Sequence, residues 1–266
     1  MTAEDDALDA PTPDGDARAA ALDPAYLRAA TQCLQLWQEV CDRAEVPAGL
    51  VVKFRVSFSL IAHAMNHVAQ ALEVIERYPL VAATSARVAL EHALTAQWVL
   101  LTKGGEETLV NHMKHSWMMR SQEFANATNT HDKLKPILDL DPIPGSDRGL
   151  SARMLCDRFD SSGLFYDTYR DLSQAVHPTH GTITAHFEAV VAEHGQNSSN
   201  RIAPAGGAER IGSCATGLGL AAVLAVDAFE RLRDGSPRLH EVGKIATTAG
   251  LPHDLRYSDQ VPGLRD

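Results

Sequence analysis

With 266 residues, of which 45% are hydrophobic, the chain is long enough for one large domain or two small ones with a substantial core. The formal net charge of −10 argues against a long nucleic-acid-binding surface, because phosphate binding needs clustered Lys and Arg. The four scattered cysteines form no Cys-x-x-Cys pair, and neither a signal peptide nor a stretch of about 20 apolar residues is recognised. We therefore expect a soluble, cytoplasmic protein that does not contact a membrane.

The first half of the chain predicts a tail followed by four helices. Residues 1–22 are rich in Asp, Ala and Pro, lack an apolar period, and are predicted to form a disordered acidic tail. Asp23-Pro24 resembles an N-cap followed by proline at the first helical position, which predicts a helix to about residue 44. Apolar residues at steps of three and four predict further helices over residues 50–77, 80–102 and 106–126.

The second half is more broken. Residues 127–150 are predicted to be loops with one short helix near 133–138, followed by helices over 151–159 and from Gly163 to Pro178. Residues 181–192 could be strand or helix, and 196–207 form a polar loop. A long helix over 208–233 carries small residues that predict close helix packing, either within the bundle or across a dimer. A short helix over 237–249 and a loose tail at 251–266 follow.

These elements predict an all-α protein with about six main helices and no defensible strand pattern. The predicted organisation is a disordered tail (1–22), a single helical-bundle domain (23–250) and a loose C-terminal tail (251–266).

One stretch, residues 169–178, carries a chemical pattern. Arg170 and His177 are seven residues apart, so on a continuous helix they would differ by only about 20° around the axis, with Ser173 between them. A cation, a hydroxyl and a group that titrates near neutral pH could together bind a phosphate and move a proton. The alternative is structural: His177 stabilises the end of the helix, and Arg170 pairs with a nearby acid, Asp167 or Asp171.

An Arg-x4–6-His signature on a late helix of a small bundle resembles the HEPN superfamily, many of whose members are ribonucleases of toxin or defence systems. Asp171, a polar residue directly after the arginine, also matches that family. The resemblance implies metal-independent RNA cleavage with Arg170 and His177 as catalytic residues. His177 would move the proton of a ribose 2′-OH or of the leaving oxygen, and Arg170 would hold the scissile phosphate. It also implies Asp171 and Ser173 as supporting residues, a homodimer, and an antitoxin or other system partner.

A second resemblance is to bacterial helical-bundle proteins of unknown function that carry Arg-x3-Glu on an apolar helix and Tyr-x3-Ser-x3-His-Pro on a later one. The matching residues are Arg87, Glu91, Tyr169, Ser173 and His177. Arg87 and Glu91 could form a structural ion pair, or Arg87 could be a second phosphate ligand beside Arg170. The alternative function is therefore a non-catalytic scaffold or interaction protein, in which these same residues hold the motif helix in place.

Histidine pairs leave a metal site as a weaker alternative. His63 and His67 are four residues apart, His112 and His115 are three apart, and His177 and His180 flank a proline. Neither Glu-x-x-His nor His-Glu-x-x-His occurs in the chain. We therefore expect no metal and no cofactor.

Overall fold

The computed structural model describes residues 24–131, 150–160, 162–177 and 211–257. Within these residues every regular element is a helix, which confirms the all-α prediction. The elements are α1 (Pro24–Val40), the 3₁₀ helix η2 (Ala48–Leu50), α2 (Val51–Val74), α3 (Pro79–Leu101), α4 (Gly105–Thr128), α6 (Ala152–Phe159), α7 (Leu164–Gln174), α9 (Ile211–Leu232) and α10 (Leu239–Ala249). The predictions for residues 1–22, 133–138, 181–192 and 196–207 lie outside the described residues.

Five of these helices have 17 residues or more, and three are short, so the predicted count of about six main helices is not confirmed. The boundaries follow the sequence signals. Pro24 and Pro79 each occupy the first position of a helix, where a missing N–H costs nothing. Ser151 caps α6 by accepting a hydrogen bond from the backbone N–H of Met154 at 3.2 Å.

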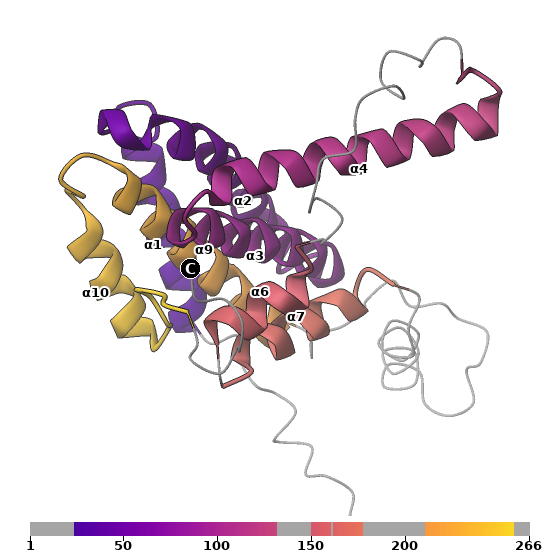
Figure 1. Ribbon diagram of the computed structural model, residues 1–266. Helices are drawn as coiled ribbons and strands as arrows, with labels where there is room; N and C mark the ends of the chain where they lie inside the picture. Colours follow the sequence, from indigo (N-terminus) through magenta and orange to yellow (C-terminus); the bar gives the residue numbers. More distant parts are fainter. Residues whose placement is uncertain (1–23, 132–149, 161, 178–210, 258–266) are drawn as a thin grey trace, which may run out of the picture.

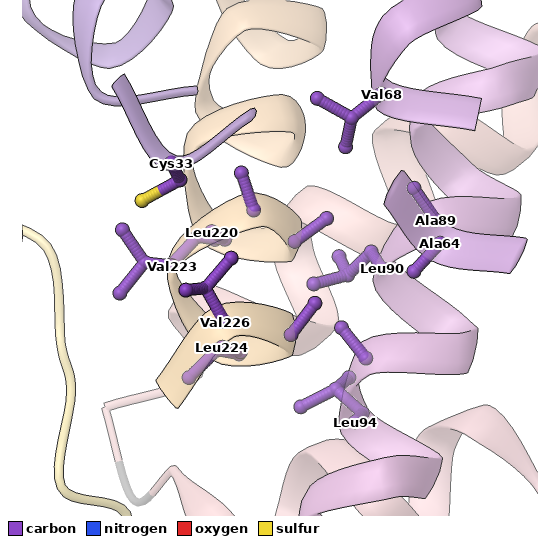
Figure 2. Close-up of a cluster of buried hydrophobic side chains, with 14 of the residues drawn as sticks. Cys33, Ala64, Val68, Ala89, Leu90, Leu94, Leu220, Val223, Leu224 and Val226 are labelled. Atoms are coloured by element: carbon purple, nitrogen blue, oxygen red, sulfur yellow. The ribbon is translucent and has the colours of Figure 1, made fainter. Parts of the chain in front are cut away.

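Helix α9 forms the centre of the bundle, with α1, α2 and α3 packed around it (Figure 1). Every residue from Cys214 to Glu230 except Thr216 is buried, so α9 is apolar on all sides, as a core helix must be. Figure 2 shows its Leu220, Val223 and Leu224 among side chains of α1, α2 and α3. At one end, Phe229 packs edge-on against Trp37 with ring centroids 5.0 Å apart.

The small residues of α9 serve close packing inside the bundle. A Cβ atom added to Gly217 would lie 2.6 Å from Cδ1 of Leu172 on α7. One added to Gly219 would lie 3.2 Å from the carbonyl oxygen of Tyr26 on α1. Of the two alternatives that the sequence left open for this face, the structure supports packing within one chain. Gly217 is what lets α7 lie against the core.

Helix α4 leaves the bundle after its first turns and extends well beyond the other helices (Figure 1). The corner before it is fixed by Lys53 of α2, whose Nζ donates to the carbonyl oxygens of Leu100 and Thr102 at 3.1 and 3.0 Å. A cation suits this end of α3, where carbonyl groups lack helical partners. Lys53 thus ties α2 to the corner between α3 and α4.

The chain after α10 packs against the bundle at its start. Leu251 and Leu255 are buried, and the ring of Tyr257 stacks on that of Phe159 of α6 with centroids 5.7 Å apart. The boundary expected at residue 250 therefore does not separate packed from loose chain. Residues 258–266 lie outside the described part.

Two stretches are long and apolar enough to cross a membrane, residues 48–74 and 212–232. The apolar window of the second is 83% buried inside the bundle, as expected of a core helix, whereas that of the first is 22% buried. Length and composition alone do not establish a membrane-spanning role for either.

Candidate functional site

Arg87 links α3 to α7 through two hydroxyl groups. Its Nε donates to Oγ of Ser173 at 3.0 Å, and its Nη2 donates to the hydroxyl of Tyr169 at 2.6 Å. The hydroxyl of Ser173 in turn donates to the backbone carbonyl of Tyr169 at 2.7 Å. Together with Glu91 these residues form what we call the Arg87 cluster. The two short patterns that the sequence associated only by resemblance thus meet in space.

The charge of Arg87 is only loosely balanced. The nearest approach of Glu91 is 3.9 Å, between its Oε2 and Nη2 of Arg87, which is the outer limit of an ion pair. The two side chains are 22% and 40% exposed. The guanidinium group is therefore held mainly by neutral hydroxyls, at the boundary between core and solvent. Such a group can fix one helix on another, and it can also attract an anion.

Arg170 pairs with an acid of its own helix. Its Nη2 lies 3.0 Å from a carboxylate oxygen of Asp167, one turn earlier on α7, and both side chains are about 60% exposed. This is one of the two structural pairings that the sequence left open. A surface pair of this kind contributes little to stability, because water screens it.

The expected helical stripe from Arg170 to His177 is interrupted. Helix α7 ends at Gln174, and the N–H groups of Ala175 and Val176 bond to carbonyls three residues back, which tightens the chain into a turn. His177 lies in this turn and is exposed. The prediction that the helix continues up to Pro178 was therefore wrong, because the last turn is no longer α-helical.

The two supporting residues also have other partners. Asp171 accepts a hydrogen bond from the hydroxyl of Ser213 on α9 at 3.3 Å. Ser173 is bonded to Arg87, as described above. In the described part of the chain these two side chains are thus bonded to α9 and α3. Their expected role in orienting Arg170 is thus unsupported by the geometry, whereas both residues connect α7 to the helices beneath it.

The sequence patterns missed a second polar cluster, at the end of α9. Asp227 is 1% exposed and accepts from Nε2 of Gln97 and from Nε of Arg231, both at 2.9 Å. Arg231 also donates to Asp254 at 2.8 Å. We call these four residues the Asp227 network. An acid inside an otherwise apolar helix was the available signal, because a buried carboxylate needs partners.

The described residues contain no group of three His, Cys, Asp or Glu side chains that surrounds a common metal position. His180, the partner expected for His177, lies outside those residues. His63 and His67 do meet, with their Nε2 atoms 3.3 Å apart.

No family model matches this chain, and neither a curated protein nor a solved structure shows significant similarity to it.

Proposed function

We propose that this protein is a non-catalytic helical interaction protein, in which α4 is the binding element and the Arg87 cluster is structural. The observation that carries the proposal is the row of large apolar side chains on the projecting part of α4. Met113, Trp117 and Phe124 are 59%, 51% and 59% exposed. Apolar side chains of this size that gather on one surface mark an interaction site.

These side chains form one stripe. At 100° per residue, Met113, Trp117, Arg120 and Phe124 fall within about 60° of one another around the helix axis. Met119, which is 50% exposed, falls outside the stripe, about 130° from its centre around the helix axis. The binding face is therefore a narrow stripe that runs along the helix axis.

The stripe is complementary to itself, so the partner we propose is a second copy of the chain. If two α4 helices pack antiparallel about an axis between positions 118 and 119, Met113 lies opposite Phe124, and Trp117 lies opposite Arg120. The first pair is apolar, and the second allows the guanidinium group to lie over an indole ring, which is a favourable cation–π contact. A homodimer of this kind agrees with the dimer that the sequence resemblance implies.

The Arg87 cluster supports the non-catalytic assignment. Both hydroxyls that the motif supplies are used as hydrogen-bond acceptors by Arg87, so the motif residues hold α7 onto α3. Arg170 contributes to neither contact. This corresponds to the scaffold alternative, in which a cytoplasmic bundle presents a binding element.

Sedimentation equilibrium tests the proposed partner. We expect the wild-type protein to be a dimer, and Trp117→Ala to weaken dimerisation at least about tenfold, because central aromatic residues dominate interface energies. Met119→Ala is the matched control, equally exposed but outside the stripe, and should dimerise like the wild type. A monomeric wild type, or equal effects of the two substitutions, would contradict the proposal.

One observation favours a second function, a HEPN-like endoribonuclease. Arg170 and His177 are both exposed, as residues that contact RNA must be. In that case Arg170 would hold the phosphate and His177 would move the proton, with RNA as substrate and an antitoxin as a natural partner. The loosely balanced charge of Arg87 could add a second phosphate contact.

Incubation with total RNA in the presence of EDTA separates the two functions. Our lead proposal expects no cleavage by the wild type. Cleavage that leaves 2′,3′-cyclic phosphate ends, and that His177→Ala and Arg170→Ala both abolish without a change in melting temperature, would instead establish the nuclease. Asp157→Ala on α6, which removes an exposed carboxylate paired with Arg153, serves as the control variant.

A further inference from the structure

Three imidazole rings lie together where α2 packs on α3. His63 and His67 are one turn apart on α2, and their ring centroids are 4.6 Å apart. The ring of His92, on α3, lies with its centroid 4.6 Å from that of His63. The sequence paired only the first two, because the neighbourhood of His92 depends on how the two helices pack. We call these three residues the histidine cluster.

The two histidines of α2 can share one hydrogen bond, but only while one of them is neutral. Their Nε2 atoms face each other at 3.3 Å, so one nitrogen must donate its N–H and the other must accept through its lone pair. When both rings are charged, both Nε2 atoms carry hydrogen and neither can accept. The contact between His63 and His67 therefore tolerates at most one positive charge.

A buried nitrogen also opposes a charge on His67. Its Nδ1 is buried and makes no hydrogen bond. In the neutral ring this nitrogen can stay unprotonated, with the proton on Nε2, which donates to His63. The charged ring must place an N–H at Nδ1, and a buried donor without an acceptor costs the full desolvation penalty of that group. Protonation of His67 therefore favours a conformation in which this nitrogen reaches water.

His92 is the third ring that resists a charge. Its Nδ1 lies 2.8 Å from the carbonyl oxygen of Val88, and because a carbonyl can only accept, Nδ1 carries the proton of the neutral ring. Burial is the largest cause of the lowered pKa of His92; the bond to Val88 and, least of all, Glu91 oppose it, whereas the charge of His63 adds to it. Burial, followed by the two neighbouring histidines, likewise lowers the pKa of His67.

The other described helices that pack on α2 bring little charge to this point. Residues 211–226 of α9 and the whole of η2 contain no charged side chain. Helix α1 packs on α2 through the ring of Trp37. Helix α4 meets α2 at the ion pair of Lys53 and Glu106, about 15 Å along α2 from the cluster. The carboxylate that acts on the cluster from the described residues is therefore that of Glu91, on α3.

We propose that the histidine cluster makes the packing of α2 on α3 sensitive to mild acid. Above about pH 6.5 the rings are mostly neutral, and the contact between the two helices is kept. At lower pH the rings gain like charges and an N–H without an acceptor, which separates the middle of α2 from α3. Because the folded protein binds fewer protons at His67 and His92 than the unfolded chain does, its stability falls below about pH 6.5, until the pH lies below both lowered pKa values. This inference depends on neither proposed function.

Hydrogen exchange of the full chain near pH 7.5 and near pH 5.5, corrected for the intrinsic pH dependence of exchange, tests the proposal. We expect peptides from the middle of α2 and α3 to lose protection at least about threefold more than peptides of α10 on acidification, because the opening is local. The double variant His67→Asn and His92→Asn should lose no more protection there than in α10. Each variant is compared with itself at two pH values, so a constant cost of the substitutions cancels. His240→Asn, an exposed histidine of α10, is the control and should behave like the wild type.

Nuclear magnetic resonance titration of the imidazole signals gives an independent result. The signals of His67 and His92, assigned from the single Asn variants, should titrate below the usual pKa of about 6.5. Both pKa values should rise in His63→Asn, which removes a neighbouring charge and should remain folded because its side chain is exposed. Equal losses of protection in the wild type and the double variant, or usual pKa values for both rings, would overturn the proposal.

Discussion

The Asp227 network and the Arg87 cluster are both built around an arginine, but their surroundings differ. Arg231 pairs with two carboxylates at 2.8 and 2.9 Å, and one of them is 1% exposed. Arg87 has one carboxylate at 3.9 Å, and its close partners are the hydroxyls of Tyr169 and Ser173. In the first, a buried carboxylate at the end of α9 is matched by close charged and polar partners, whereas in the second the arginine is held by hydroxyls and only loosely by a carboxylate.

The difference indicates how each cluster responds to change. When a buried carboxylate is removed, its charged and polar partners are left without an acceptor, so the loss of stability is large. A hydroxyl contact near solvent can be replaced in part by water, so the cost is small. We therefore expect the Asp227 network to be purely structural. The Arg87 cluster can combine a structural role with other contacts.

Asp227→Ala should have the largest effect. It leaves Gln97 and Arg231 without their shared acceptor, and we expect a loss of about 3 kcal/mol, at the lower end for broken buried pairs because Arg231 is 27% exposed. For a chain of this size that lowers the melting temperature by about 6–12 °C. Asp157→Ala, which removes a carboxylate from an exposed ion pair with Arg153, should change it little. Equal melting temperatures would show that the network is dispensable.

Gly217→Ala tests the packing of α7 independently of hydrogen bonds. The added Cβ would meet Leu172, which is 1% exposed and has little room to move. We expect a loss of about 1–2 kcal/mol, the usual cost of overpacking. Gly212→Ala on the same helix meets nothing within 4 Å and should be neutral or stabilising, since alanine favours the helix. Thermal unfolding compares the two, and identical shifts would contradict a close α7–α9 contact.

The fold was largely predictable because its signals are local. Proline at positions 24 and 79 and the serine at 151 each mark a helix start, and the structure places a helix at or next to each. Other features of the fold depend on tertiary packing and could not be predicted from local signals. The burial of Leu251 and Leu255 depends on neighbours that are distant in sequence, such as Gly219 of α9, which Leu251 approaches.

The site was predictable only in part, for the same reason. The spacing of Tyr169 and Ser173 identified one face of α7, and the spacing of Arg87 and Glu91 a face of α3, but spacing does not show which faces meet. The choice between Arg170 and Arg87 as partner of Ser173 needed the packing of α3 on α7, and the structure selects Arg87. Asp227 was missed although Arg231 lies one turn later on the same helix, because its burial and its bond to Gln97 depend on how α3 packs on α9.

Thiol labelling reports the smallest expected effect, a change in local opening around the Arg87 cluster. Burial raises the pKa values of Cys33, Cys156 and Cys214 to about 12, so at pH 8 only about one thiol in ten thousand at these positions is ionised. The folded protein should therefore show one readily reactive thiol, that of the half-buried Cys41, and four after unfolding.

Cys156 lies on α6, beside α3 and α7, where it senses the charge of Glu91. Arg87→Met removes two hydrogen bonds from this region, and a loss of about 1 kcal/mol would speed the labelling of Cys156 about fivefold through more frequent local opening. Cys33, on α1, should label at its original rate. Arg170→Met is the matched control, because its arginine contacts Asp167 at the surface. If Cys156 is labelled at the same rate in both variants, the Arg87 cluster does not hold α7 in place. That result would favour a catalytic role for the exposed motif residues.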